Sequence, residues 1–191
     1  MKNLKRCSWV NLKNQLYVDY HDNEWGVPVR DDQKLFEFIV LESAQAGLSW
    51  EIILKKREGY RKAFKGFDPK KVAKMDEKDI AKLLIDASIV RNQLKIRATV
   101  NNAQRFLEIQ KEFGSFSNYM WAWVKERPIQ NSWKNISNLP AKIELGEVIA
   151  KDLKKRGFKF LGPTVWYAHM QAVGMVNDHT VDCFRYRKKS R

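Results

Sequence analysis

Four residues near the two ends of the chain carry side chains that bind metals. They form two pairs, Cys7 with His21 and His179 with Cys183. Two thiolates and two imidazoles are a complete tetrahedral ligand set for zinc, which leaves no open position for a catalytic water. The spacing of 179 and 183 predicts one face of a helix, which suits chelation. These residues alone leave two interpretations equally open: a structural metal, or reduced core cysteines with hydrogen-bonded histidines. A Cys7–Cys183 disulfide is a lesser alternative.

The composition predicts a folded cytosolic protein. The 191 residues fit one domain, or a large and a small lobe around a shared core. Hydrophobic residues make up 44% of the chain, which excludes global disorder. With two cysteines, no export signal and no apolar run long enough to span a membrane, the thiols are expected to be reduced in the cytosol unless they bind a metal.

The net charge of +14 favours a polyanionic partner, and nucleic acid is the commonest one in the cytosol. The alternatives are a solvated basic surface and an anionic membrane. No strongly basic amphipathic helix with an aromatic underside occurs, which argues against the membrane. The basic run from Arg185 to Arg191 is expected to be a loose tail.

Capping residues and apolar spacing predict helix after helix, so the expected fold class is all-α. Helices are expected to begin after Asp31 or Asp32, Ser49, Asp68 and Asp76, and then to cover about 92–113, 116–124, 143–156 and 164–173. The stretch 126–140, with prolines at both ends and few periodic apolar residues, is the plausible linker. No alternating strand pattern is found.

Within the helix after Asp32, Glu42 projects from a stripe of apolar residues that includes Leu35, Phe38 and Ile39. A carboxylate there must gain partners or shift its pKa. The commoner alternative is a structural acid that pairs with a core arginine or caps a neighbouring helix. Five aromatic residues occur near the first metal pair and just after this helix: Trp9, Tyr17, Tyr20, Trp25 and Trp50. An acid ringed by aromatic planes suits a flat base read on its edge, although core packing explains each aromatic taken alone.

The break between helices at 86–92 is a second candidate site. The helix that follows opens with Arg91, Asn92 and Lys95. Backbone amides at a helix N-terminus, with cations nearby, bind phosphate. This is the logic of the helix-hairpin-helix module of DNA repair proteins, although any helical protein has such turns.

Five segments in order along nearly the whole chain carry a family resemblance. They are 20–28 (YHDNEWGVP), 45–50 (QAGLSW), 154–160 (KKRGFKF), 170–172 (MQA) and 176–179 (VNDH). With these segments the chain resembles the 3-methyladenine DNA glycosylase I family, the constitutive alkylation-repair enzymes of bacteria.

The resemblance implies a helix-hairpin-helix glycosylase fold as a single domain over 1–191. Its core helices would span about 31–125, and a small zinc-tied lobe would comprise about 1–28 plus 157–185. It further implies that Glu42 reads the base. The other implied site residues are Tyr20, Trp50, Tyr17, Trp9 and Trp25 around the base, and Cys7, His21, His179 and Cys183 around a structural zinc ion. Arg91 and Lys95 would contact DNA, and Leu48, exposed on the turn after Gly47, would be the wedge that fills the gap left by a flipped base.

The implied activity is that of a monomeric, monofunctional DNA glycosylase that acts on double-stranded DNA with alkylated bases. No membrane partner is expected. It would flip out 3-methyladenine and hydrolyse its N-glycosidic bond, leaving the free base and an abasic site. The methylated base is cationic and departs neutral, so binding and orientation can supply most of the catalysis. Glycosylases of the wider superfamily often place a catalytic Asp shortly after the hairpin, and here none occurs between Asp86 and Asp152. Glu42 is expected to accept a hydrogen bond from the exocyclic amine. Whether it also activates water stays open.

Three positions depart from the family pattern. Ser43 and Ser88 stand where glycine is usual, and His169 stands where an aromatic such as Phe is expected. If the hairpin needs a positive φ at 88, Ser88 costs about 1 kcal/mol, which makes DNA contact through Arg91 and Lys95 less secure. His169 is expected to be a core substitution and not a ligand.

Overall fold

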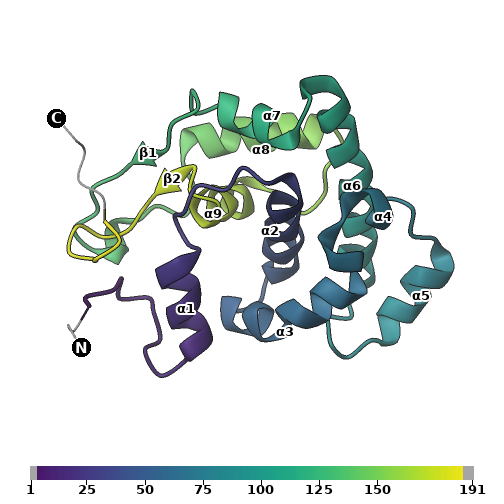
Figure 1. Ribbon diagram of the computed structural model, residues 1–191, viewed down its shortest axis with the longest axis horizontal. Coiled ribbons are helices and arrows are strands. Elements are labelled where there is room, and N and C mark those ends of the chain that lie inside the picture. Colours follow the sequence, from purple (N-terminus) through teal and green to yellow (C-terminus); the bar gives the residue numbers. More distant parts are fainter. Residues whose placement is uncertain (1–3, 187–191) are drawn as a thin grey trace.

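The computed structural model describes residues 4–186, so most of the basic C-terminal run, 187–191, lies outside the described residues, as do 1–3. The expected helical class is confirmed (Figure 1). The helices are α1 (Gln15–Asn23), α2 (Asp32–Gln45), α3 (Trp50–Ala63), α4 (Pro69–Val72), α5 (Glu77–Ile85), α6 (Gln93–Phe113), α7 (Phe116–Ala122), α8 (Glu144–Lys155) and α9 (Pro163–Ala172). Two 3-10 turns, η1 (Lys65–Phe67) and η2 (Ile136–Asn138), and two short strands, β1 (Ile129–Gln130) and β2 (Val176–Asn177), complete the list.

Side-chain caps set most helix starts where the sequence predicts them. Asp31 accepts from the backbone N–H of Lys34, Ser49 from that of Ile52, and Asn92 from that of Lys95. These bonds satisfy amides that have no partner inside the helix. The long helix α6 ends at Gly114, whose φ of 81° is a conformation that glycine adopts without strain.

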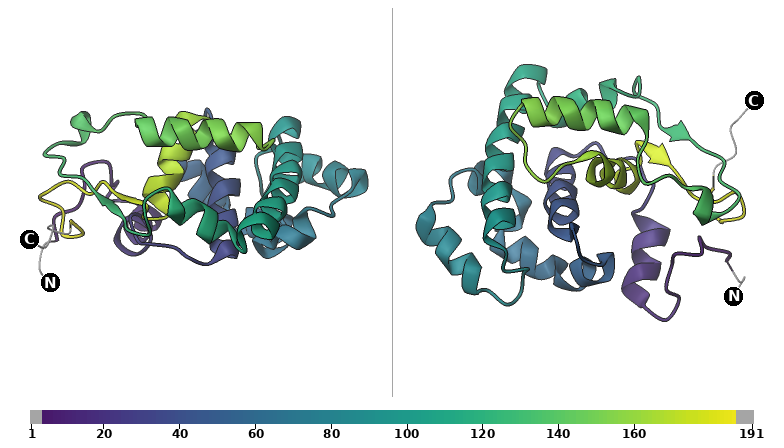
Figure 2. Two further views of the ribbon diagram at one scale, coloured as in Figure 1. Left: turned by 90° about the horizontal axis from the view of Figure 1, so that it is seen from above. Right: turned by 180° about the vertical axis from the view of Figure 1, so that it is seen from behind.

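Helix α2 lies at the centre of the body. Figures 1 and 2 show it enclosed by α3, α6 and α9, with α7 and α8 across one side. Leu35, Phe36, Ile39 and Leu41 of this helix are fully buried. Burial of such side chains is the main stabilising contribution to the fold. A central helix of this kind can hold a polar side chain away from water, as it does with Glu42.

Three local predictions are wrong. Helix α1 was not expected, and the stretch 126–140 is no plain linker, because β1 pairs in parallel with β2 and η2 follows it. Residues 179–183 form a turn and not a helix. In that turn the amide of Cys183 donates to the carbonyl of Thr180 at 2.8 Å, so a turn brings 179 and 183 together.

The hairpin at 86–92 is fastened to α3. Lys56 donates to the carbonyl of Ala87 at 2.6 Å, and the hydroxyl of Tyr60 accepts from the amide of Val90 at 3.2 Å. A Cβ added at Gly59 would lie 2.3 Å from the carbonyl oxygen of Ser88, so the close approach requires glycine in the helix. Ser88 itself is not among the described residues with positive φ. The strain considered for it is therefore absent.

His169 lies in the core, as expected. It is fully buried on α9, and its ring stacks on Trp166 with centroids 4.6 Å apart. Neither ring nitrogen has a hydrogen-bond partner among the described residues. Burial lowers the pKa of His169 to about 3, which keeps the imidazole neutral.

Across residues 4–186, the structure has no helix with both the length and the apolar character that a membrane crossing requires.

Candidate functional site

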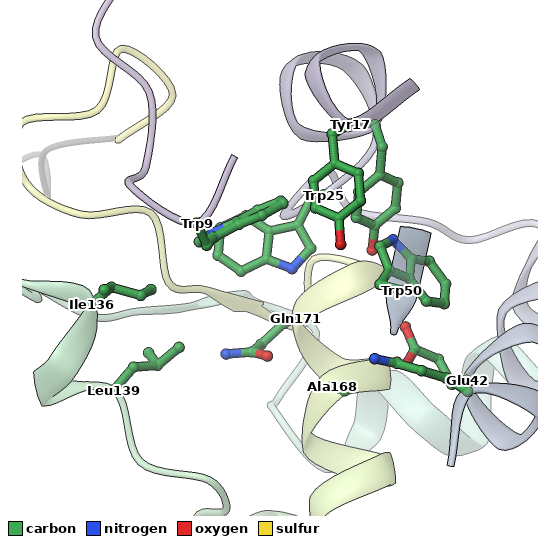
Figure 3. A pocket seen from close by; sticks show the side chains of 11 residues that line it. Trp9, Tyr17, Trp25, Glu42, Trp50, Ile136, Leu139, Ala168 and Gln171 are labelled. Carbon is green, nitrogen blue, oxygen red and sulfur yellow. The ribbon is translucent and has the colours of Figure 1, made fainter. Parts of the chain in front are cut away.

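A pocket opens between α1, α2, α9 and the start of α3 (Figure 3). Its volume is about 280 Å³, at the small end of the roughly 300–1,000 Å³ of ligand pockets. The six residues predicted around the base all line it: Trp9, Tyr17, Tyr20, Trp25, Glu42 and Trp50. The structure therefore brings the predicted set together, in a space suited to one flat ring system.

The aromatic side chains pack against one another around the pocket in edge-to-face and tilted arrangements. The rings of Trp9 and Trp25 lie 5.1 Å apart at 74°, and those of Tyr20 and Trp50 lie 5.2 Å apart at 53°. Burial, and then the nearby Glu42, raise the pKa of Tyr20 well above its ordinary value, so the phenol stays neutral. Mutual packing of this kind holds the rings in place before any guest enters.

Glu42 reaches the pocket from the central helix, with 4% of its surface exposed. Its carboxyl group makes no hydrogen bond to any described residue. Of the two outcomes expected for an acid on an apolar stripe, the structure therefore has the pKa shift: burial raises the pKa of Glu42 to about 8. With this pKa the group is mostly protonated at neutral pH. A guest with a positive charge or an N–H donor would favour the carboxylate.

Trp50 and Gln171 present further polar atoms to the pocket. The indole Nε1 of Trp50 is buried and has no acceptor among residues 4–186. The amide nitrogen of Gln171 donates to Asp178 at 2.7 Å, which fixes the orientation of the amide and leaves its oxygen free of that contact. Figure 3 places the Gln171 amide on the pocket floor, across from the aromatic rings. A guest can thus accept from the Nε1–H of Trp50 and donate to the amide oxygen of Gln171, besides its contact with Glu42.

The sequence reasoning missed five residues of the lining: Gln45, Ile136, Leu139, Ala168 and Gln171. Ile136 and Leu139 lie in the stretch expected to be a linker, where they form an apolar wall (Figure 3). The only signal for them was a pair of isolated apolar residues between polar ones. Gln45 and Gln171 lie in segments of the family resemblance, but nothing in their spacing marks them.

Asp178 holds this second wall in place. Its carboxylate is fully buried and accepts four hydrogen bonds of 2.5–2.7 Å. The donors are Asn131 and Trp133, which precede η2, and Tyr167 and Gln171 on α9. A buried charge needs such partners, and these four tie the Ile136–Leu139 wall to the pocket floor.

The four predicted metal ligands come together at the chain ends. Cys7, His21, His179 and Cys183 are all buried, and their ligand atoms lie within 4.8 Å of one another. The Sγ atom of Cys183 is 3.4 Å from Nε2 of His21 and 3.5 Å from Nδ1 of His179. Ligands around a tetrahedral zinc ion are separated by about 3.6 Å, given its usual bond lengths. The cluster could bind a metal, and both cysteines are free of disulfides.

The remaining ring nitrogens of both histidines are engaged outside the cluster. Nδ1 of His21 donates to Asp22 at 2.7 Å, and Nε2 of His179 donates to the carbonyl of Trp25 at 3.0 Å. These contacts fix which nitrogen of each ring faces the cluster, as is usual around metal-binding histidines. Because Trp25 also lines the pocket, the cluster and the pocket share a wall.

The predicted DNA-contact residues differ in their surroundings. Arg91 is exposed beside the hairpin. Leu48 is half-buried and packs partly on the core, so the expectation that it is exposed is wrong. Lys95 points to the end of α2, where its ammonium donates to the carbonyls of Ala44 at 2.9 Å and Ala46 at 2.5 Å.

A helical body with a small aromatic pocket around one buried acid is the arrangement of a protein that binds a single flat base. The family model described as methyladenine glycosylase matches residues 9–186. The chain belongs to the methyladenine glycosylase family.

Relatives and solved structures agree with this membership over nearly the full length. DNA-3-methyladenine glycosylase 1 of Escherichia coli (strain K12) is 47% identical over 183 residues, which cover 96% of this chain and 97% of that protein. DNA-3-methyladenine glycosylase of Haemophilus influenzae (strain ATCC 51907 / DSM 11121 / KW20 / Rd) is 48% identical over 178 residues, covering 93% and 96%. A Staphylococcus aureus 3-methyladenine DNA glycosylase I structure matches with a TM-score of 0.93 at 38% identity, covering 98% and 99%. A variant of 3-methyladenine DNA glycosylase I in complex with 3-methyladenine matches with a TM-score of 0.90 at 40% identity, covering 92% and 95%.

Proposed function

We propose that this chain is a monofunctional DNA glycosylase that releases 3-methyladenine from alkylated double-stranded DNA. The observation that carries the proposal is Glu42, a buried acid without a partner in an aromatic pocket of about 280 Å³. Such a group is costly unless a guest supplies its partner. A flipped purine with an exocyclic amine supplies one, and the aromatic rings stack on its faces.

The chemistry asks little of a general acid. Methylation at N3 makes the base of the nucleotide cationic, so its bond to C1′ is weak. When that bond breaks, its electron pair neutralises the ring, the base leaves neutral, and water adds to C1′ and loses a proton. Tight binding of the cationic base in a fixed orientation therefore supplies most of what the reaction needs. Glu42, as an acceptor for the exocyclic amine, becomes a carboxylate whose charge favours the cationic substrate.

The test is release of free bases from N-methylated duplex DNA by the wild type and by Glu42→Gln. The wild type is expected to release 3-methyladenine and not 7-methylguanine. Both bases are cationic in DNA, but 7-methylguanine carries a carbonyl and not an amine at C6, so it cannot donate to Glu42 from that position. The variant keeps the size of the side chain and loses the charge, so release is expected to fall by about tenfold or more. A folded wild type that releases no base would overturn the proposal.

The duplex would lie against the face formed by the hairpin at 86–92 and the turn after α2. Helices α5 and α6 with this hairpin would form the helix-hairpin-helix module. Arg91, which is exposed beside the hairpin, would contact a phosphate there. Leu48 would extend from its half-buried position to fill the gap in the duplex. The net charge of +14 supports attraction to DNA, and a single chain contains all the groups invoked.

We further propose that Cys7, His21, His179 and Cys183 hold a structural zinc ion that ties the two chain ends into a small lobe. The donor set, its burial and the outside contacts of both imidazoles support this assignment. Four protein ligands leave the ion no place in the hydrolysis. Metal analysis is expected to give about one zinc per chain, and Cys183→Ser is expected to lower it. A zinc content near zero in carefully prepared wild type would refute the assignment.

A further inference from the structure

The side chain of Lys95 does not point toward the hairpin surface, although the residue lies next to the hairpin in sequence. It lies in the first turn of α6, three residues after the cap Asn92. Its ammonium nevertheless points away from the exposed hairpin surface and donates to the carbonyls of Ala44 and Ala46. The last carbonyls of a helix have no partner within it, and a cation there also interacts favourably with the helix dipole. Lys95 thus caps the C-terminus of α2 from another helix.

The two capped carbonyls flank the part of α2 that leads out of the pocket. Ala44 is two residues after Glu42, and Ala46 directly precedes the turn of Gly47, Leu48 and Ser49. Gly47 is exposed with φ of 79°, and no atom would lie within 4 Å of a Cβ there, so no neighbouring side chain packs against Gly47 itself. The ammonium of Lys95 fixes the carbonyl of Ala46, directly before the turn.

The use of its donors argues against Lys95 as a phosphate contact. An ammonium has three N–H donors, and two of them are engaged with carbonyl oxygens. If the Lys95 side chain turned toward a phosphate, both carbonyls would lose this partner, and the C-terminal end of α2 would be destabilised. Arg91, four residues earlier, is exposed and makes no side-chain hydrogen bond to any described residue.

We propose that Lys95 is a positioning residue that connects the start of α6, next to the hairpin, to the end of α2 and the turn carrying Leu48. Glu42 and Trp50 lie on either side of that turn, so Lys95 also helps to position these two pocket residues. The inference rests on the proposed function, because it assigns the hairpin to DNA and the pocket to the flipped base. Lys95 then sets the geometry between the two contacts and does not itself bind DNA.

The test compares Lys95→Met with Arg91→Met. Each variant keeps most of the side-chain length and removes the charge. Binding to undamaged duplex DNA is measured as a function of salt, and single-turnover release of 3-methyladenine is measured at saturating enzyme. A lost phosphate contact lowers the slope of log affinity against log salt by about 0.9. Arg91→Met is expected to show this loss. Lys95→Met is expected to keep the wild-type slope and to release the base more slowly, on the order of tenfold.

A decrease of about one in the salt slope for Lys95→Met would overturn the proposal, because it would identify a phosphate contact. Release at the wild-type rate would overturn it as well. Failure of the proposed function would look different, since the wild type itself would then release no base. If Lys95→Met folds poorly, Lys95→Gln allows the same discrimination. It keeps a donor without the charge, so an unchanged slope supports positioning and a lowered slope contradicts it.

Discussion

Replacement of His169 by phenylalanine is expected to stabilise the protein, and to do so more strongly in acid. The imidazole is fully buried against Trp166, and its two nitrogens have no partner among the described residues. Phenylalanine keeps a flat ring in the same stack and removes both polar atoms. Because a buried unsatisfied polar group costs about 1–3 kcal/mol, His169→Phe is expected to raise the free energy of unfolding by about that amount at neutral pH. For a chain of this size each kcal/mol raises Tm by about 2–4 °C.

The pH dependence follows from the pKa of the same group. Burial lowers the pKa of His169 to about 3, against an ordinary value of 6.5. Between these values the unfolded chain binds a proton that the folded protein does not, so the wild type loses stability as the pH falls through this window. By pH 4 the loss amounts to about 3 kcal/mol. His169→Phe lacks this contribution.

The measurement is urea unfolding of the wild type and His169→Phe at about pH 7, 5.5 and 4. Other titrating groups are common to both proteins, so the difference between the two isolates His169. We expect this difference to grow as the pH falls. A difference that is the same at every pH, or a variant less stable than the wild type at pH 7, would refute the reasoning and would mean that the ring nitrogens have partners in solution.

Three further substitutions test other features. Glu42→Gln is expected to stabilise the protein relative to the wild type, increasingly as the pH rises. The pKa of Glu42 is about 8 in the folded protein against an ordinary 4.5, so the wild type loses free energy of unfolding as the pH rises between these values. Unfolding measurements at pH 8 are expected to show a loss of about 4 kcal/mol that the variant lacks. Gly59→Ala is expected to cost about 1–3 kcal/mol and to weaken duplex binding, because its Cβ would meet the Ser88 carbonyl at 2.3 Å; unchanged stability would mean that the hairpin can move away from α3. Asp178→Asn is expected to weaken binding of free 3-methyladenine, measured by calorimetry, because an amide cannot accept all four hydrogen bonds that fix the pocket floor. Tyr167→Phe, which removes only one donor outside the lining, is its control, and equal affinities for Asp178→Asn and the wild type would contradict the assignment.

The sequence predicted the helices whose ends carry their own signals. Asp31, Ser49 and Asn92 are caps whose effect is local, so α2, α3 and α6 begin where expected. Helix α1 was missed because its aromatic residues face the pocket and do not follow the apolar period of a core helix. The turn at 179–183 was mistaken for a helix because a spacing of four residues fits both structures. Whether these segments form a helix or a turn depends on contacts between distant parts of the chain, and residue spacing does not reveal those contacts.

The pocket was predictable where residue type and position are both unusual. Glu42 on an apolar stripe is such a case, and so are aromatic residues crowded near the metal pairs. Ile136 and Leu139 are ordinary residues that become a wall only because Asp178 fastens their segment to α9. The monomeric state, the cytosolic location and the division into a core and a zinc lobe remain predictions.

The cluster at the chain ends also bears on the lifetime of the folded state. Cys7 and His179 are 172 residues apart in sequence, and Cys183 lies beyond them. Contacts between such distant residues form late in folding, because the chain must first lose the entropy of closing the intervening loop. A metal held there would stabilise the native state and hardly affect the transition state for folding. Its removal would therefore raise the unfolding rate and leave the folding rate nearly unchanged. The chain ends would then govern how long each molecule stays folded, and the helical body how fast it forms.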